Sequence, residues 1–173
     1  MNERDGKNTK ETTMTVADLL NEVTTAPVQK RAITNLNTLN EAYAYGSAFS
    51  RGMRIDLGKF VLLLISGTAS IDENGKTVHD GDLRAQTRRT FENITQLLAS
   101  EGATWKDIVR TTCYLRDIER DYKAFNEERT NFYNEQGLNP LPASTGIQAI
   151  LCRPDLLIEI EAIAMFRRET PEE

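Results

Sequence analysis

The chain has 173 residues, which suffice for one domain with a substantial core and are too few for two. Its 26 acidic residues outnumber the 21 basic ones, and this balance argues against binding to nucleic-acid phosphates. The polar residues 1–14 lack the apolar run of a secretory signal, and the longest aliphatic block, 61–65, is too short to cross a membrane. We therefore expect a cytoplasmic protein that binds neither nucleic acid nor membranes.

The first part of the chain carries weak structural signals. Residues 1–46 are predicted to form a partly disordered N-terminal extension, with short helices favoured at 16–23 and 31–43. The folded domain is expected over 47–168, and 169–173 are expected to form a disordered tail.

From residue 47 onward, hydrophobic periodicity and turn residues predict a regular series of elements. These elements are strands at 47–56 and 60–66, a helix at 83–100, a strand at 108–116, a helix at 121–136, and strands at 143–151 and 156–166 joined by a hairpin turn at 153–155. Right-handed crossovers place both helices on the same side of one mixed sheet, so the fold class is α+β. The other face of the sheet is then uncovered, and we expect self-association to bury it.

The last predicted strand carries acids in an aliphatic context. Strand alternation puts Ile158 and Ile160 on one face and Glu159 and Glu161 on the other. If the uncovered face is a subunit interface, both glutamates lie on it or at its rim.

Catalytic chemistry is first narrowed by what the chain lacks. His79 is the sole histidine and is predicted to face solvent, so His-based metal sites and a Ser-His-Asp triad within one chain are excluded. Glycine-rich nucleotide motifs are missing as well, and we expect no metal and no cofactor. Cys113 and Cys152 lie in apolar runs, which predicts two buried core thiols and fits a reducing compartment.

A set of polar residues near strand ends and turns remains, and it suits the binding of a small polar molecule. The set comprises Ser66, Thr68, Ser70, Asn126, the PASTG stretch, Glu159 and Glu161. The plainer alternative is that the hydroxyls satisfy turn backbone and the glutamates pair with Arg51, Arg54 or Arg110.

Four sequence motifs resemble the RidA superfamily, also called YjgF or L-PSP endoribonuclease-like, over residues 47–166. The motifs are LISGTASIDENGK, a Gln86-to-Asn93 spacing on the first helix, YKAFNE, and LPASTG followed by LIEIEAIA. The resemblance implies a chorismate-mutase-like fold and a homotrimer with a central barrel and three ligand clefts between subunits. It also implies hydrolysis of 2-imino or 2-enamino acids to 2-keto acids and ammonia.

Three residues carry over from the family's motifs. Ser66 matches the serine of the SG motif, Asn126 the family's asparagine, and Glu159 the first glutamate of EIEAIA. By this resemblance Glu159 and Ser66 are the expected catalytic residues, and Asn126 is expected to bind substrate.

Two positions depart from the family's pattern. Ser144 stands where the family has an arginine that grips the substrate carboxylate, and Phe49 stands where it has a tyrosine. Ser144, Phe49 and the adjacent Thr145 are the expected substrate-binding positions. Arg51 and Arg54 flank the first strand and are the candidates to replace the missing guanidinium.

The sequence thus favours a RidA-like hydrolase or deaminase of non-standard specificity, whose small-molecule ligand lies between subunits. Because Ser144 replaces the carboxylate-binding arginine, we do not expect the standard 2-imino acid deaminase activity. One alternative is a ligand-binding trimer without catalysis. Another is a chorismatase-like enzyme in which Glu159 protonates the enol ether of an aromatic or enol-ether acid.

Overall fold

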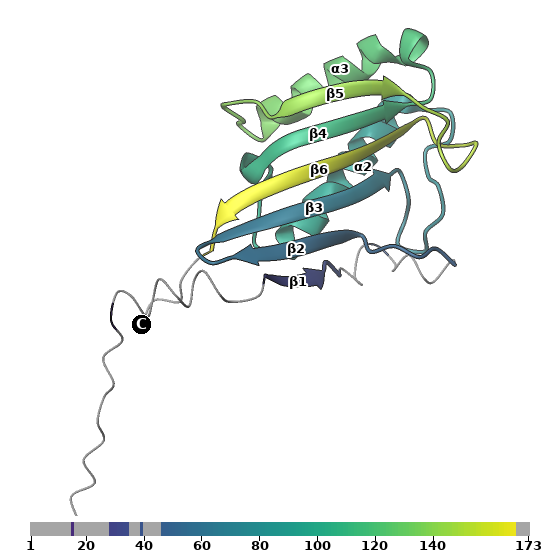
Figure 1. Ribbon diagram of the computed structural model, residues 1–173. Coiled ribbons are helices and arrows are strands. Elements are labelled where there is room, and N and C mark those ends of the chain that lie inside the picture. The colour runs from purple at the N-terminus through teal and green to yellow at the C-terminus, as the bar shows by residue number, and fades with distance from the viewer. Residues whose placement is uncertain (1–14, 16–27, 35–38, 40–45, 169–173) are drawn as a thin grey trace, which may run out of the picture.

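A six-stranded mixed sheet with two helices on one face organises the protein (Figure 1). The computed structural model describes residues 15, 28–34, 39 and 46–168. The strand order is β1-β2-β3-β6-β4-β5. In chain order the elements are β1 (Gln29–Ala32), β2 (Gly52–Leu57), β3 (Phe60–Ala69), α2 (Leu83–Ala99), the short 3₁₀ helix η2 (Trp105–Asp107), β4 (Ile108–Leu115), α3 (Ile118–Glu135), β5 (Ala143–Gln148) and β6 (Ile158–Arg167). This arrangement confirms the α+β class.

The helices begin at acidic caps that the sequence carries. Asp82 accepts a hydrogen bond from the Ala85 amide at the start of α2, and Asp117 accepts one from the Arg120 amide at the start of α3. Gly102, with φ of 73°, lies just after α2, where a left-handed residue ends a helix at low cost. No helix in the described ranges is long and apolar enough to cross a bilayer.

The prediction of a helix at 31–43 is wrong at its start. Arg31 and Ala32 belong to β1, which pairs antiparallel with β2. The backbone edge of β2 is a non-local partner that helical periodicity does not register. Ile33 and Leu39 are buried in the same core as the rest of the sheet. The helix predicted at 16–23 and the tail at 169–173 lie outside the described residues.

The prediction of a hairpin between the last two strands is also wrong. β4 lies between β5 and β6, pairing parallel with β5 and antiparallel with β6. Residues 149–157 therefore pass over the end of β4, and Cys152 lies exposed in this loop, contrary to its predicted burial. The prediction was correct for Cys113, which is buried on β4.

The core fills the space between the sheet and the helices. Phe91 of α2 stacks on Phe132 of α3 with ring centroids 4.5 Å apart, and Trp105 packs edge-on against both. Two buried amides of α2 hold loops: Asn93 donates to the carbonyls of Ala69 and Ile71, whereas the Gln86 side chain bonds residues just before β6. The spaced Gln and Asn motif thus positions the ends of β3 and β6.

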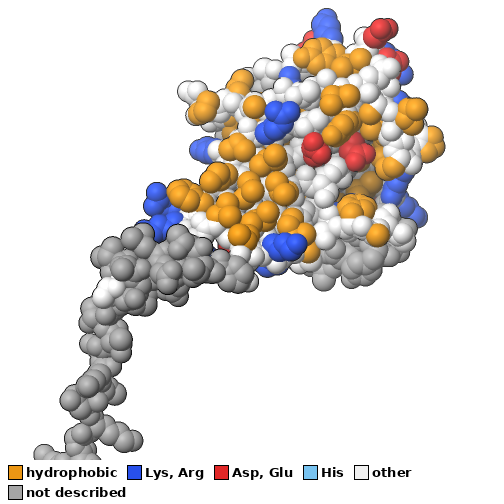
Figure 2. Space-filling model, viewed as in Figure 1, with side chains coloured by type: hydrophobic (Ala, Val, Ile, Leu, Met, Phe, Trp, Pro, Cys, Tyr) orange, Lys and Arg blue, Asp and Glu red, His pale blue; other side chains and the backbone are white. Residues whose placement is uncertain are grey.

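The opposite face of the sheet carries apolar side chains with no covering layer in this chain. Figure 2 shows hydrophobic side chains gathered over the strands on this open face. Its members include Leu64, Ile147 and Met165, each about two-fifths exposed. An apolar face of this kind indicates an interaction surface.

Candidate functional site

Glu159 of β6 points to the open face, as strand alternation predicted. Ile158 and Ile160 are fully buried on the helix side, whereas Glu159 is half-buried. Burial raises the pKa of the Glu159 carboxyl, and the neighbouring Glu161 raises it further. Within the described part of the chain no cation or hydrogen-bond donor contacts this carboxylate, so it holds a proton more tightly than an exposed glutamate.

The β3 backbone makes room for Glu159 at Gly67. A Cβ on Gly67 would lie 1.9 Å from the Glu159 Oε1 atom, so a side chain at residue 67 would force the carboxylate to move. The register of β3 against β6 shifts between Ile65 and Thr68, which marks a bulge at Ser66 and Gly67. Gly67 of the SG motif therefore lets the Glu159 carboxylate pack directly against the β3 backbone.

A depression of about 760 Å³ lies around Glu159. Its lining includes Phe49, Arg51, Ser66, Gly67, Cys152, Arg153, Glu159 and Glu161. We call this set the Glu159 group. Mixed apolar and polar walls of this kind suit a small polar ligand.

The structure defines how three predicted residues of this group are used. The Ser66 hydroxyl donates to the Ser50 carbonyl at 2.7 Å and so holds the loop before β2. Phe49 is 44% exposed, and the Arg51 guanidinium lies 5.6 Å from its ring centroid. Arg51 also lines the depression.

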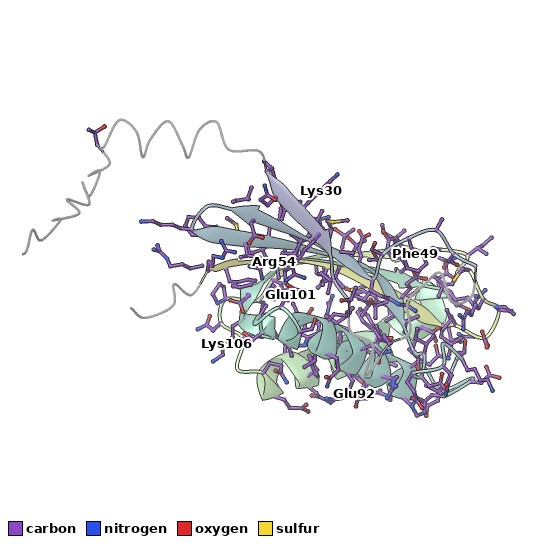
Figure 3. All side chains as sticks on the ribbon, turned by 90° about the horizontal axis from the view of Figure 1, so that it is seen from below. Lys30, Phe49, Arg54, Glu92, Glu101 and Lys106 are labelled. Carbon is purple, nitrogen blue, oxygen red and sulfur yellow. The ribbon has the colours of Figure 1, made fainter. Side chains whose placement is uncertain are left out.

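Arg54 is not brought there. It pairs across β2 and β3 with the core-facing Leu63, so its side chain lies on the helix side. There it donates to Asp56 at 2.9 Å and to Glu101 at 3.3 Å. Figure 3 shows Arg54 beside Glu101 and far from Phe49. The expectation that Arg54 contacts ligand is corrected by this strand parity.

Asn126 and Ser144 lie in a second place, between α3 and the edge strand β5. Ser144 pairs in register with the core-facing Thr111 and accepts a hydrogen bond from its hydroxyl at 3.0 Å. Arg129 of α3 donates to the Ser144 hydroxyl at 3.0 Å and to the Asn126 Oδ1 atom at 2.6 Å. We call Asn126, Arg129 and Ser144 the Arg129 group.

The two groups face opposite sides of the sheet within one chain. Glu159 lies on the open face of β6, whereas Ser144 lies on the helix side of β5, with β4 between the two strands. Thr145 points to the open face, where Arg110 donates to its hydroxyl at 3.0 Å. One chain thus brings Ser66, Arg51 and Phe49 to Glu159 but keeps Asn126, Ser144 and Thr145 away.

Sequence reasoning missed several residues at these sites. Arg153, which the sequence placed in a turn between the last two strands, lines the Glu159 depression because the 149–157 loop folds over that end of the sheet. Arg129 lies one helical turn after Asn126, and this spacing was the available signal for their contact. Gly67 was present in the SG motif without an assigned role.

Metal binding gains no support from the geometry. Across residues 46–168 and the shorter described segments, no three His, Cys, Asp or Glu side chains converge to hold a metal ion. His79 is exposed with φ of 62°, in agreement with its predicted position at the surface. Burial raises the pKa of the Cys113 thiol, which suits a packed side chain rather than a nucleophile.

Known proteins resemble this chain in both sequence and fold. A 3-aminoacrylate deaminase, RutC, of Acinetobacter baylyi is 37% identical over 103 residues, or 60% of this chain and 78% of that protein. A RutC family protein of Pyrococcus abyssi is 34% identical over 110 residues, covering 64% and 81% of the two chains. The crystal structure of the E. coli YjgF gene product superposes with a TM-score of 0.65 at 26% identity, covering 79% of this chain and 99% of that one.

The family match extends over most of the chain. The sequence profile of the Endoribonuclease L-PSP family matches residues 38–166, which include the strands and helices from β2 to β6 except the last residue of β6. The mixed sheet with two helices on one face is the chorismate-mutase-like fold expected from the motifs. The chain belongs to the Endoribonuclease L-PSP family, within the RidA/YjgF superfamily.

Proposed function

We propose that this protein is a cofactor-independent hydrolase that deaminates a small imine or enamine acid in clefts between the subunits of a homotrimer. The observation that carries the proposal is the Glu159 carboxyl, half-buried on an open sheet face, with a raised pKa and a depression beside it. The 37% identical 3-aminoacrylate deaminase supports the reaction class.

The proposed chemistry needs only water and one proton-transfer group. Glu159 protonates an enamine carbon to give the imine, or receives a proton from the water that attacks the imine carbon. The proton passes to nitrogen, the C–N bond breaks, and a carbonyl compound and ammonia leave. A carboxyl with a raised pKa suits both steps because it gains and loses a proton closer to neutral pH than an ordinary glutamate.

The subunit cleft explains why one chain divides its candidate residues between two places. The apolar open face and the single-sided pairing of β5 both leave surface for a second copy. In a closed trimer, the Glu159 group of one subunit meets the Arg129 group of a neighbour. Sedimentation equilibrium should give the mass of three 19.5 kDa chains, and a monomer alone would refute this assembly.

The specificity is proposed to differ from that of arginine-bearing relatives. Ser144 supplies a hydroxyl where the family's motif has a guanidinium, so a bidentate contact from the strand is lost. Turnover of 2-iminobutyrate at the rate of an arginine-bearing relative would contradict this point.

The two cysteines are unpaired, which supports our placement of the protein in the reducing cytoplasm.

Ligand binding without turnover is the second candidate. It is favoured by Ser66, whose hydroxyl donates to the Ser50 carbonyl and is thereby committed to the loop. A chorismatase-like reaction on an aromatic or enol-ether acid is the third, since a proton-holding Glu159 would also suit protonation of an enol ether.

Freshly generated 3-aminoacrylate and 2-iminobutyrate test the proposal, with ammonia release as the readout. Wild-type protein should accelerate release from one of them, and E159Q should lower the rate about a thousandfold if general acid–base catalysis operates. E92Q is the matched control, because Glu92 is an exposed α2 residue near Arg89. Equal rates for wild type and E159Q would refute the enzyme proposal, and 2-oxobutyrate binding without any turnover would select the second candidate.

A further inference from the structure

Arg129 holds its guanidinium between a helix and the sheet edge by contacts to neutral groups. One terminal nitrogen donates to the Ser144 hydroxyl at 3.0 Å and the other to the Asn126 side-chain oxygen at 2.6 Å. The guanidinium carbon lies 5.0 Å from the Phe125 ring centroid, one helical turn earlier. Two hydrogen bonds and a ring contact fix the orientation of this cation.

Arg129 differs in charge environment from the other arginines of α2 and α3. Arg84 and Arg88, also on the helix side, pair with glutamates of α3, and Arg120 pairs with Asp121. Among the described residues Arg129 has no carboxylate within ion-pair distance. Two of its five N–H groups donate to Ser144 and Asn126, which leaves donors for the planar, two-point contact that a carboxylate accepts.

Ser144 creates the space that the guanidinium occupies. Its hydroxyl accepts hydrogen bonds from both Arg129 and Thr111, and its sulfur neighbour Cys113 lies 3.9 Å away. A longer side chain at residue 144 would compete with Arg129 for this volume. Ser144 thus replaces the family's arginine on β5, and the Arg129 guanidinium of α3 lies against it instead.

The buried Tyr133 hydroxyl lies next to this cluster. Tyr133 is only 5% exposed, and burial raises its pKa, whereas the nearby Thr111 hydroxyl and the charge of Arg129 act to lower it. Thr111 also donates to Ser144, so Tyr133 belongs to the polar surroundings of the Arg129 group.

We propose that Arg129 is the anion-binding residue of this protein's ligand site, gripping a ligand carboxylate at the β5 edge while Ser144 and Asn126 hold its guanidinium in place. This inference rests on the proposed function for the cleft but names a residue that the family motif does not contain. The ligand therefore carries a carboxylate, and the cation reaches it from the α3 side instead of from β5. Asn126 and Ser144 act as positioning residues in this arrangement.

Calorimetric titration of the full chain with 2-oxobutyrate tests Arg129 separately from turnover. Wild-type protein should bind 2-oxobutyrate and fail to bind butanone, its neutral analogue without the carboxylate. R129Q should weaken 2-oxobutyrate binding roughly ten- to a hundredfold, the loss expected for charge-assisted hydrogen bonds. R129K should also bind more weakly than wild type because an ammonium lacks the planar fork.

R167Q is the matched control. Arg167 also lies over an aromatic ring, with its guanidinium carbon 5.4 Å from the Phe60 centroid, but it is the last residue of β6 and lies at the opposite end of that strand from Glu159. It should bind 2-oxobutyrate as wild type does, and thermal unfolding should show that all variants remain folded. The proposal is overturned if wild type does not bind 2-oxobutyrate, if butanone binds equally well, or if R129Q and R129K bind as tightly as wild type.

The outcome for Arg129 can be told apart from the outcome for the enzyme proposal. E159Q should retain 2-oxobutyrate binding while losing turnover, whereas R129Q should lose binding. Binding that depends on Arg129 in a protein without turnover would sustain this inference and refute the hydrolase. Turnover that depends on Glu159 with carboxylate binding unchanged in R129Q and R129K would do the reverse.

Discussion

The Glu159 group and the Arg129 group differ from the other charged clusters in one respect. Those clusters are balanced: Arg54 lies between Asp56 and Glu101, and Arg84 and Arg88 share the glutamates of α3. Among the described residues, Glu159 contacts no cation and Arg129 contacts no carboxylate. Balanced charges stabilise a fold, whereas unbalanced, half-buried charges of opposite sign on two sides of one sheet require a ligand or a second chain.

After loss of the Glu159 carboxyl itself, the largest expected effect comes from filling the space beneath it. G67A places a methyl group where the Glu159 Oε1 atom lies, so the carboxylate must move. We expect turnover to fall at least about a hundredfold, as for a displaced acid–base group, and stability to fall by about 1–3 kcal/mol. Ammonia release and urea unfolding measure the two effects.

G146A is the glycine control for that variant. A Cβ at Gly146 meets its nearest atom, in the Tyr122 ring, at an ordinary 3.6 Å. Stability should change by less than about 0.5 kcal/mol. Equal rates of ammonia release for G67A and G146A would show that the close fit between Gly67 and Glu159 is not needed for turnover.

A balanced network should respond to charge removal through stability. The Glu101 side chain is 2% exposed and accepts hydrogen bonds from Arg31 and Arg54. E101Q should lower the free energy of unfolding by about 2 kcal/mol, because it leaves the mostly buried Arg54 guanidinium without the Glu101 anion. R129Q should cost less than about 1 kcal/mol, since its partners are neutral and its side chain is part-exposed. Equal losses in urea unfolding would erase the distinction between the two kinds of charge.

The pH dependence of stability gives the smallest and most specific effect. Burial, followed by repulsion from Glu161, raises the pKa of Glu159, so the native state holds this proton more tightly than the unfolded chain does. Stability from this group is present below the unfolded pKa, near 4.3, and is lost as pH rises through the higher folded pKa. E159Q should abolish this loss of stability at high pH, because glutamine does not ionise.

Urea unfolding of wild type and E159Q across pH 4 to 8 measures this difference. The variant should gain stability relative to wild type as pH rises, with the gain complete above the folded pKa. A relative loss at high pH would mean that the Glu159 carboxylate is stabilised when charged, contrary to the pKa shift.

Local patterns predicted most of the sheet, and non-local contacts account for the errors. The alternation through Ile158 and Ile160 was sufficient to orient Glu159, because strand parity depends only on neighbouring residues. The pairing of β1 with β2 and the insertion of β4 between β5 and β6 are distant contacts that periodicity does not encode. Local structure was therefore more predictable than strand order.

The candidate site shows the same limit. Glu159, Ser66 and Phe49 were identified from motifs, and the structure brings them to one depression. Arg129 was not identified from the sequence, because its contact with Ser144 joins residues of two different elements. Arg129, which we propose replaces the missing arginine, lies on α3 outside the LPASTG motif, so the motif could not identify it.

Complementation between two inactive variants tests the central claim most directly. In a cleft shared between subunits, a chain carrying R129Q still supplies Glu159, and a chain carrying E159Q still supplies Arg129. Unfolding the two variants together and refolding the mixture should restore about a quarter of wild-type ammonia release, because random assembly unites the two intact residues at that share of interfaces. A mixture as inactive as either parent would contradict a site built from the Glu159 group of one subunit and the Arg129 group of its neighbour.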